Sequence, residues 1–215
     1  MNKINALLTL YTSTKKNIAE PIRLRVYRCI SWLKKAELSE DDLDIKFISL
    51  WIAFNAIYAK DVDLQMSDRS AFRQFLQIVN KRAKNEVYEL TWKKYPAEIR
   101  ILLDNKYVFQ PFWEFHNGRY SEAAWLEDFA SEKQSVKRSL ETQDSESLLM
   151  VLFSRIYTLR NQIFHGGSTY ASKANRAALG NACKLLGVYT ELFLKIVLED
   201  PNEEEWGVPY YPYIS

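Results

Sequence analysis

Residues 145–167 read SESLLMVLFSRIYTLRNQIFHGG, and they carry the clearest fold signal in the chain. Apolar residues recur at steps of three and four, which places them on one face of an α-helix. At about 100° per residue, one sector collects Leu148, Leu149, Leu152, Ile156, Leu159 and Ile163. The doublet Gly166-Gly167 is typical of a helix C-terminus. The stretch therefore predicts an amphipathic helix that begins at Ser145 or Ser147 and ends at the glycines.

Three further segments show helical spacing. The first begins at Pro21 and runs to about Leu38, with apolar residues on one side and Arg23, Arg25, Arg28, Lys34 and Lys35 spread over the other faces. The second, about 42–60, is apolar nearly all round and is expected to be a central helix. The third runs from about Ala171 to Glu199 and ends before Pro201. Together with residues 145–165, they predict a helical bundle.

The region 62–141 is less regular and rich in aromatic residues. Ser67-Asp68 and Ser121 are expected to cap two of its helices, because these side chains accept hydrogen bonds from free backbone N–H groups. Shorter helices are expected around 84–93, 97–104 and 107–115, with a turn at Asn117-Gly118. We interpret the region as a helical elaboration of the bundle.

Composition narrows the class of protein. Only 6 glycines and 6 prolines occur in 215 residues, which favours helices over turn-rich β-folds. The net charge of +2 excludes a polycation, so any RNA-binding surface must be a local patch. Cys29 and Cys183 fall within apolar helical patterns and are expected to be buried free thiols, without metal-ligand spacing. Neither a signal peptide nor an apolar run of about 18 residues is present, so we expect a cytoplasmic protein without a membrane partner.

The polar face of the helix over 145–165 carries the candidate chemistry. Ser154, Asn161 and His165 lie opposite the apolar sector, and the spacing of four lets Asn161 and His165 touch. Arg160 lies instead at the edge of the apolar stripe, where a guanidinium is costly unless an anion or a carboxylate meets it. One interpretation is therefore a site for an anionic ligand. The other is structural: an arginine paired with a buried carboxylate and a histidine that only caps the helix.

The string Leu159-Arg160-Asn161-Gln162-Ile163-Phe164-His165-Gly166 resembles the Arg-Asn-x-x-x-His signature of the HEPN superfamily. The segment Trp51-Ile52-Ala53-Phe54-Asn55-Ala56-Ile57-Tyr58 resembles the Apea-like branch of that superfamily. The resemblance covers about 20–60 and 145–200. It implies an all-α, HEPN-like bundle of four to five core helices in a single domain over 1–215. Residues 62–141 would then be a helical insertion, and 201–215 an extended C-terminal tail.

The resemblance also implies a function. Active members of the superfamily are endoribonucleases that need no metal or other cofactor, and many are toxins or antiviral effectors. They dimerise through the motif helices, so that two copies of the motif face one cleft. Other members are non-catalytic modules that bind RNA, a nucleotide or a protein partner. A third possibility, a purely structural helical dimer, requires an internal carboxylate to sequester Arg160.

On this resemblance Arg160, Asn161 and His165 are the expected catalytic residues. Arg160 would hold the phosphate, Asn161 would orient His165 or the phosphate, and His165 would transfer protons. Asn55, Tyr58 and Ser154 are expected to contact the substrate, although Tyr58 also fits a role in core packing.

A toxin of this type has a neutralising partner, either an antitoxin or a nucleotidyltransferase. In some members such a transferase modifies a tyrosine two positions after the histidine. Here Gly167 occupies that position, and Tyr170 is the nearest tyrosine.

Overall fold

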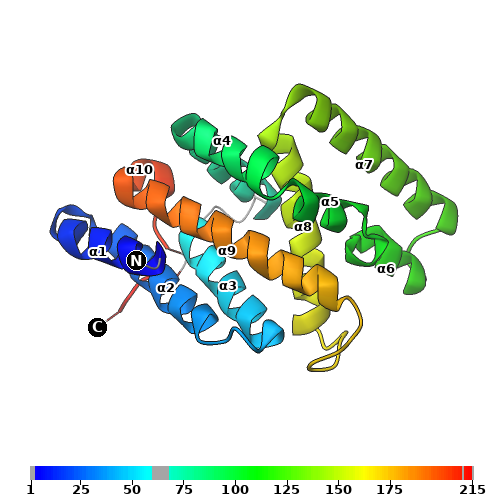
Figure 1. The fold of residues 1–215 in the computed structure, drawn as a ribbon, viewed down its shortest axis with the longest axis horizontal. Helices are drawn as coiled ribbons and strands as arrows, with labels where there is room; N and C mark the ends of the chain where they lie inside the picture. Colours follow the sequence, from blue (N-terminus) through cyan, green and yellow to red (C-terminus); the bar gives the residue numbers. More distant parts are fainter. Residues whose placement is uncertain (1–2, 60–67, 210, 215) are drawn as a thin grey trace. The chain divides into compact units, whose positions relative to one another are not determined.

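The computed structural model describes residues 3–59, 68–209 and 211–214. The chain is all-α, as predicted, and the described residues contain no strand (Figure 1). The α-helices are α1 (Lys3–Thr14), α2 (Glu20–Glu37), α3 (Leu43–Tyr58), α4 (Asp68–Tyr88), α5 (Pro96–Asp104), α6 (Gln110–His116), α7 (Glu122–Thr142), α8 (Ser145–Phe164), α9 (Arg176–Glu199) and α10 (Glu203–Trp206). Short turns of other helix types lie at Lys15–Asn17, Glu89–Lys94 and Lys106–Val108.

The helices form two compact units. The first comprises Met1–Glu86 and Leu186–Ser215, and the second Val87–Leu185. Two helices, α4 and α9, run from one unit into the other. Helix α4 loses helical geometry at Ala83, where φ is −135° and ψ is 41°. The expected helix start near residue 84 coincides with this break. The expectation of a single domain stays a prediction.

The first unit is built around α2 and α3, which pack along each other (Figure 1). As expected for a central helix, α3 buries residues on several sides. A cluster of aromatic rings surrounds its C-terminal half: Phe54 stacks on Tyr58 at 4.4 Å between ring centroids and meets Phe72 edge-on at 5.5 Å. Phe193 and Trp206 join the cluster through Phe75. Aromatic contacts therefore connect α3 and α4 to the C-terminal segment of this unit.

Arg25 does not lie on a polar face of α2, as the sequence pattern predicted, but is buried. Its guanidinium donates to the carbonyl oxygens of Ala56 and Ile57 at the end of α3, and to those of Trp206 and Gly207 in the tail. Burial lowers its pKa to about 10, so the side chain remains charged at neutral pH. Carbonyl oxygens that the helix end leaves unpaired, together with those of the tail, solvate the buried cation. The pattern missed this because the acceptors are distant in the sequence.

The second unit contains α5 to α8. Helix α8 packs against α7, α5 and the turn Lys106–Val108. Phe109, Phe112 and Trp125 form a small buried core, onto which other aromatic side chains of α6 and α7 pack. Ser121 caps α7 as predicted and accepts a hydrogen bond from the Ala124 backbone N–H at 3.2 Å. Gly118 has a φ of +71°, in keeping with the predicted turn.

Helix α8 begins at Ser145, one of its two predicted starts, and Asp144 caps it by accepting from the Ser147 backbone N–H at 3.1 Å. Other predicted boundaries shift in the structure. Helix α9 begins at Arg176 rather than near Ala171, because Ala171 and Asn175 both have a φ of 55°. The expected extended tail opens with one helical turn, α10. The predicted cap Ser67 lies outside the described residues.

Two further findings concern the cysteines and the apolar character of the helices. Cys29 and Cys183 are buried thiols outside any disulfide in the described part of the chain, as predicted. Burial raises the pKa of the Cys29 thiol well above its usual value. Within the described ranges, none of the helices combines the length and the apolar character needed to cross a lipid bilayer.

Candidate functional site

The C-terminal end of α8 positions the motif. Gly166 has a φ of +69°, and its N–H donates to Ile163 O at 3.2 Å. The N–H of Gly167 donates to Gln162 O at 2.7 Å. This pair of bonds is the Schellman arrangement, which requires a left-handed residue just after the helix. The glycine doublet therefore stops the helix so that His165 is its last, capping residue.

Arg160 lies half-buried on α8 without a carboxylate partner among the described residues. Its Nη1 donates to Asn161 Oδ1 at 3.0 Å. Its Cζ lies 4.7 Å from the centroid of the Phe164 ring and 5.8 Å from that of Tyr157. Its Nε is buried and donates to no atom that the structure describes. The guanidinium is thus held by an amide and two rings, and its charge is uncompensated.

Arg155, five positions earlier on α8, takes the structural role that the sequence allowed for Arg160. It is 2% exposed and pairs with Glu132 of α7. Its guanidinium lies over two aromatic rings, with Cζ 4.5 Å from the ring centroid of Phe109 and 5.5 Å from that of Phe129. Burial lowers the pKa of Arg155, while the charges of Glu132 and Asp104 oppose that shift. An arginine buried by its neighbours in space has no local sequence signal, and the helical pattern missed it.

The remaining motif side chains are accessible. Asn161 is half-buried, whereas His165 and Ser154 are exposed. The backbone N–H of His165 donates to Asn161 O at 3.0 Å, but its imidazole makes no hydrogen bond with any described residue. Thr158, one helical turn after Ser154, is buried and donates to Ser154 O. The structure therefore brings Arg160 and Asn161 into contact and leaves the imidazole of His165 open at the helix end.

Asn55 and Tyr58 belong to the first compact unit, whereas the Arg160 motif belongs to the second. Asn55 is half-buried, and its carbonyl oxygen accepts the Ala59 backbone N–H at 2.9 Å. Tyr58 stacks on Phe54 and also meets the rings of Phe72 and Phe75. These contacts give Tyr58 a packing role, the alternative already open from the sequence. Substrate contact by Asn55 and Tyr58 stays a prediction.

Exposed aromatic side chains surround the motif within its own unit. Tyr157 and Phe164 are 43% and 45% exposed. Gln162 Nε2 donates to the carbonyl oxygen of Tyr107 at 2.7 Å, which ties the end of α8 to the turn Lys106–Val108. Tyr107 is exposed as well, and the ammonium of Lys106 lies 5.3 Å from its ring centroid. Sequence reasoning missed these residues because helical spacing alone does not reveal which aromatic rings are exposed.

Two other groups bear on the chemistry. His116, the only other histidine in the sequence, lies with its ring 4.4 Å from that of Phe112 and has a packing role. Across the residues that the structure describes, no three His, Cys, Asp or Glu side chains gather in a group able to hold a metal ion. The side chains that can act on a ligand at this site are therefore a guanidinium, an amide and an imidazole.

Comparison with protein families, with curated proteins and with solved structures returns no match to this chain.

Proposed function

We propose that this protein is an endoribonuclease of the HEPN type, with Arg160, Asn161 and His165 as its catalytic residues. The observation that carries the proposal is the state of Arg160: half-buried, fixed by Asn161 and without a carboxylate partner in the described part of the chain. A cation kept in this state binds an anion without first breaking an ion pair. A structural arginine has the environment of Arg155 instead, since that side chain already has Glu132.

The proposed reaction is transfer within RNA itself. The 2′-oxygen attacks the adjacent phosphorus, the bond to the 5′-oxygen breaks, and a cyclic phosphate remains. One group must take the proton of the 2′-OH, another must give a proton to the leaving 5′-oxygen, and a cation must stabilise the phosphorane. Arg160 fits the last role because a guanidinium donates two hydrogen bonds to phosphate oxygens. His165 fits proton transfer, and Asn161 positions the guanidinium.

Two proton transfers call for two histidines, and each chain offers one at this site. We therefore propose that the protein acts as a homodimer through the motif helices, with one His165 as base and the other as acid. The exposed rings of Tyr157 and Phe164 support this arrangement, because exposed aromatic residues are enriched where protein surfaces meet. The same rings, with Tyr107, could instead stack on unpaired RNA bases. A role as a toxin or antiviral defence component, with an antitoxin or a nucleotidyltransferase as partner, is part of the same proposal.

Cleavage of a mixed RNA pool in EDTA, with end-group analysis, tests the proposal. The wild-type protein should leave cyclic phosphate ends, and His165→Ala should leave none. His165 is exposed, so its loss should not affect folding. His116→Ala is the matched control and should cleave like the wild type, since His116 has only packing contacts. Undiminished cleavage by a pure, folded His165→Ala preparation would contradict the proposal.

A non-catalytic module that binds RNA, a nucleotide or a protein partner is the second candidate. It is favoured by one observation: Asn161 engages Arg160 rather than the imidazole, so no described side chain orients His165. This function predicts that RNA binds wild type and His165→Ala alike, without cyclic phosphate ends from either. Arg160→Ala should then lose the binding.

A further inference from the structure

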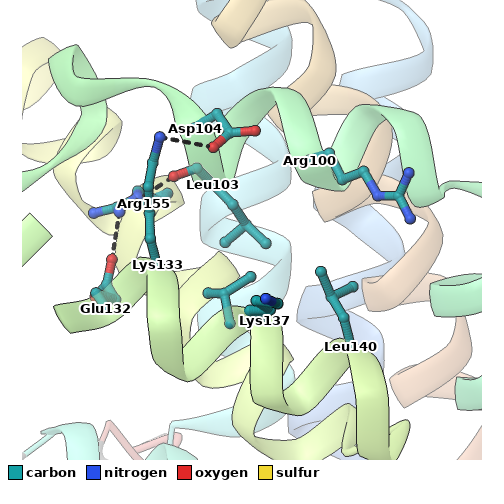
Figure 2. Close-up of a pocket in the computed structure, with 9 residues that line it drawn as sticks. Arg100, Leu103, Asp104, Glu132, Lys133, Lys137, Leu140 and Arg155 are labelled. Carbon is teal, nitrogen blue, oxygen red and sulfur yellow. Dashed lines mark hydrogen bonds and ion pairs between the residues drawn. The ribbon is translucent and has the colours of Figure 1, made fainter. Parts of the chain in front are cut away.

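A cavity of about 220 Å³ opens between α5, α7 and α8, within the unit Val87–Leu185 (Figure 2). None of the residues that line it belongs to the Arg160 motif. Basic side chains predominate in the lining. Four are cationic, Arg100, Lys133, Lys137 and Arg155, and two are anionic, Asp104 and Glu132. The walls thus carry an excess of two positive charges.

Both acidic groups of the cavity are already neutralised. Lys133 Nζ lies 3.1 Å from Asp104 Oδ1, and Arg155 pairs with Glu132, as the dashed lines in Figure 2 show. Arg100 and Lys137 remain, on α5 and α7 respectively, and neither has an ion-pair partner among the described residues. The excess charge of the cavity therefore resides on two side chains that are free to meet a ligand.

Arg155 adds a buried donor to the same cavity. The Nη2 of Arg155 donates hydrogen bonds to Glu132 and to the carbonyl oxygen of Leu103. Its buried Nε has no acceptor in the part of the chain that the structure describes. A buried donor without an acceptor destabilises the fold unless a ligand supplies the acceptor. Rings of Phe109 and Phe129 hold the guanidinium. One buried cation and two exposed ones therefore line the same cavity.

We propose that this cavity binds the phosphate group of a small phosphorylated molecule, held by Arg100 and Lys137. An excess of two positive charges matches a phosphate monoester, which is close to doubly charged at neutral pH. The three apolar side chains in the lining provide a surface for the carbon skeleton of the ligand. Typical pockets for drug-sized ligands begin at about 300 Å³, so a cavity of about 220 Å³ encloses the phosphate and only part of a ligand as large as a mononucleotide. This proposal does not depend on the ribonuclease activity.

Isothermal titration at low salt tests the proposal with three probes: inorganic phosphate, AMP and adenosine. AMP and phosphate should bind the wild-type protein, and adenosine should not. The variant Arg100→Gln/Lys137→Gln should bind AMP at least about tenfold more weakly, because each lost charge-assisted hydrogen bond is worth more than a neutral one. Both side chains are exposed, so the double variant should fold normally.

Arg138→Gln is the matched control. Arg138 is exposed, directly follows Lys137 on α7 and does not line the cavity. It should leave AMP binding unchanged. The proposal is overturned if neither phosphate nor AMP binds, if the double variant binds AMP as well as the wild type does, or if adenosine binds as tightly as AMP. It is also overturned if Arg138→Gln weakens binding as much as the double variant, since binding would then follow net charge alone.

Discussion

At the scale of single residues, the two arginines of α8 show how neighbours in space assign a role. Arg155 has a carboxylate, a carbonyl oxygen and two aromatic faces around its guanidinium. Arg160 has an amide and two partly exposed rings, but no described carboxylate. The first arrangement stabilises the unit Val87–Leu185. The second leaves a guanidinium that no described carboxylate neutralises.

This difference predicts that two similar substitutions lower stability by very different amounts. Arg155→Ala should lower the free energy of unfolding by about 3 kcal/mol, because it leaves Glu132 without its buried partner. Arg160→Ala should change stability by less than about 1 kcal/mol, since it breaks no ion pair. Urea denaturation followed by circular dichroism measures both. Equal losses for the two variants would mean that Arg160 is a structural residue.

The helical pattern predicted the position of Arg160 but not that of Arg155 or Arg25. Arg160 lies at the edge of the apolar stripe of its own helix, which periodicity alone reveals. Arg155 is buried by Glu132 and aromatic residues of other helices, and Arg25 by carbonyl oxygens of α3 and the tail. Burial of an ionised group is stable only with such partners. Partners that are distant in sequence cannot be read from the spacing within one helix.

At the scale of elements, the end of α8 fixes where the proposed catalytic side chains lie. The Gly166-Gly167 doublet was a sufficient signal for the helix stop, because only glycine takes a positive φ without strain. The start of α8 was predicted at Ser145 or Ser147, and the helix begins at Ser145 with Asp144 as its cap. By contrast, the start of α9 depends on positive φ values at Ala171 and Asn175, which neither residue type signals reliably.

The glycine stop gives a prediction at this scale. Gly166→Ala should lower the free energy of unfolding by about 1 kcal/mol, because its φ of +69° is strained for alanine. Gly166→Asn should cost less, since asparagine tolerates the left-handed region better than alanine does. Chemical denaturation of the two variants side by side measures the difference. If alanine and asparagine behave alike, the left-handed turn is not what ends the helix.

At the scale of the whole molecule, the C-terminal segment completes the unit of Met1–Glu86 and Leu186–Ser215. Trp206 is buried, packs against Phe75 and lies under the guanidinium of Arg82, whose Cζ is 5.1 Å from the ring centroid. Arg82 also pairs with Asp200, and the Trp206 indole N–H donates to Asp200 O at 2.7 Å. The carbonyl oxygens of Trp206 and Gly207 accept from Arg25. The first turn of the tail therefore packs against the rest of this unit, while Tyr211 and Tyr213 are exposed.

These contacts predict that Trp206 contributes strongly to the stability of this unit. Trp206→Ala should lower its free energy of unfolding by about 3–5 kcal/mol, the usual effect of truncating a buried tryptophan. It should also displace the carbonyl oxygens of the tail that accept hydrogen bonds from Arg25, a buried cation without a carboxylate partner among the described residues. Hydrogen exchange followed by mass spectrometry should then show faster exchange in α2 and α3 than in α5 to α8. Tyr213→Ala, an exposed aromatic residue of the same tail, should leave exchange unchanged. Uniformly faster exchange in both units would instead mean that the two units unfold together, because a local loss of packing would then propagate through α4 and α9.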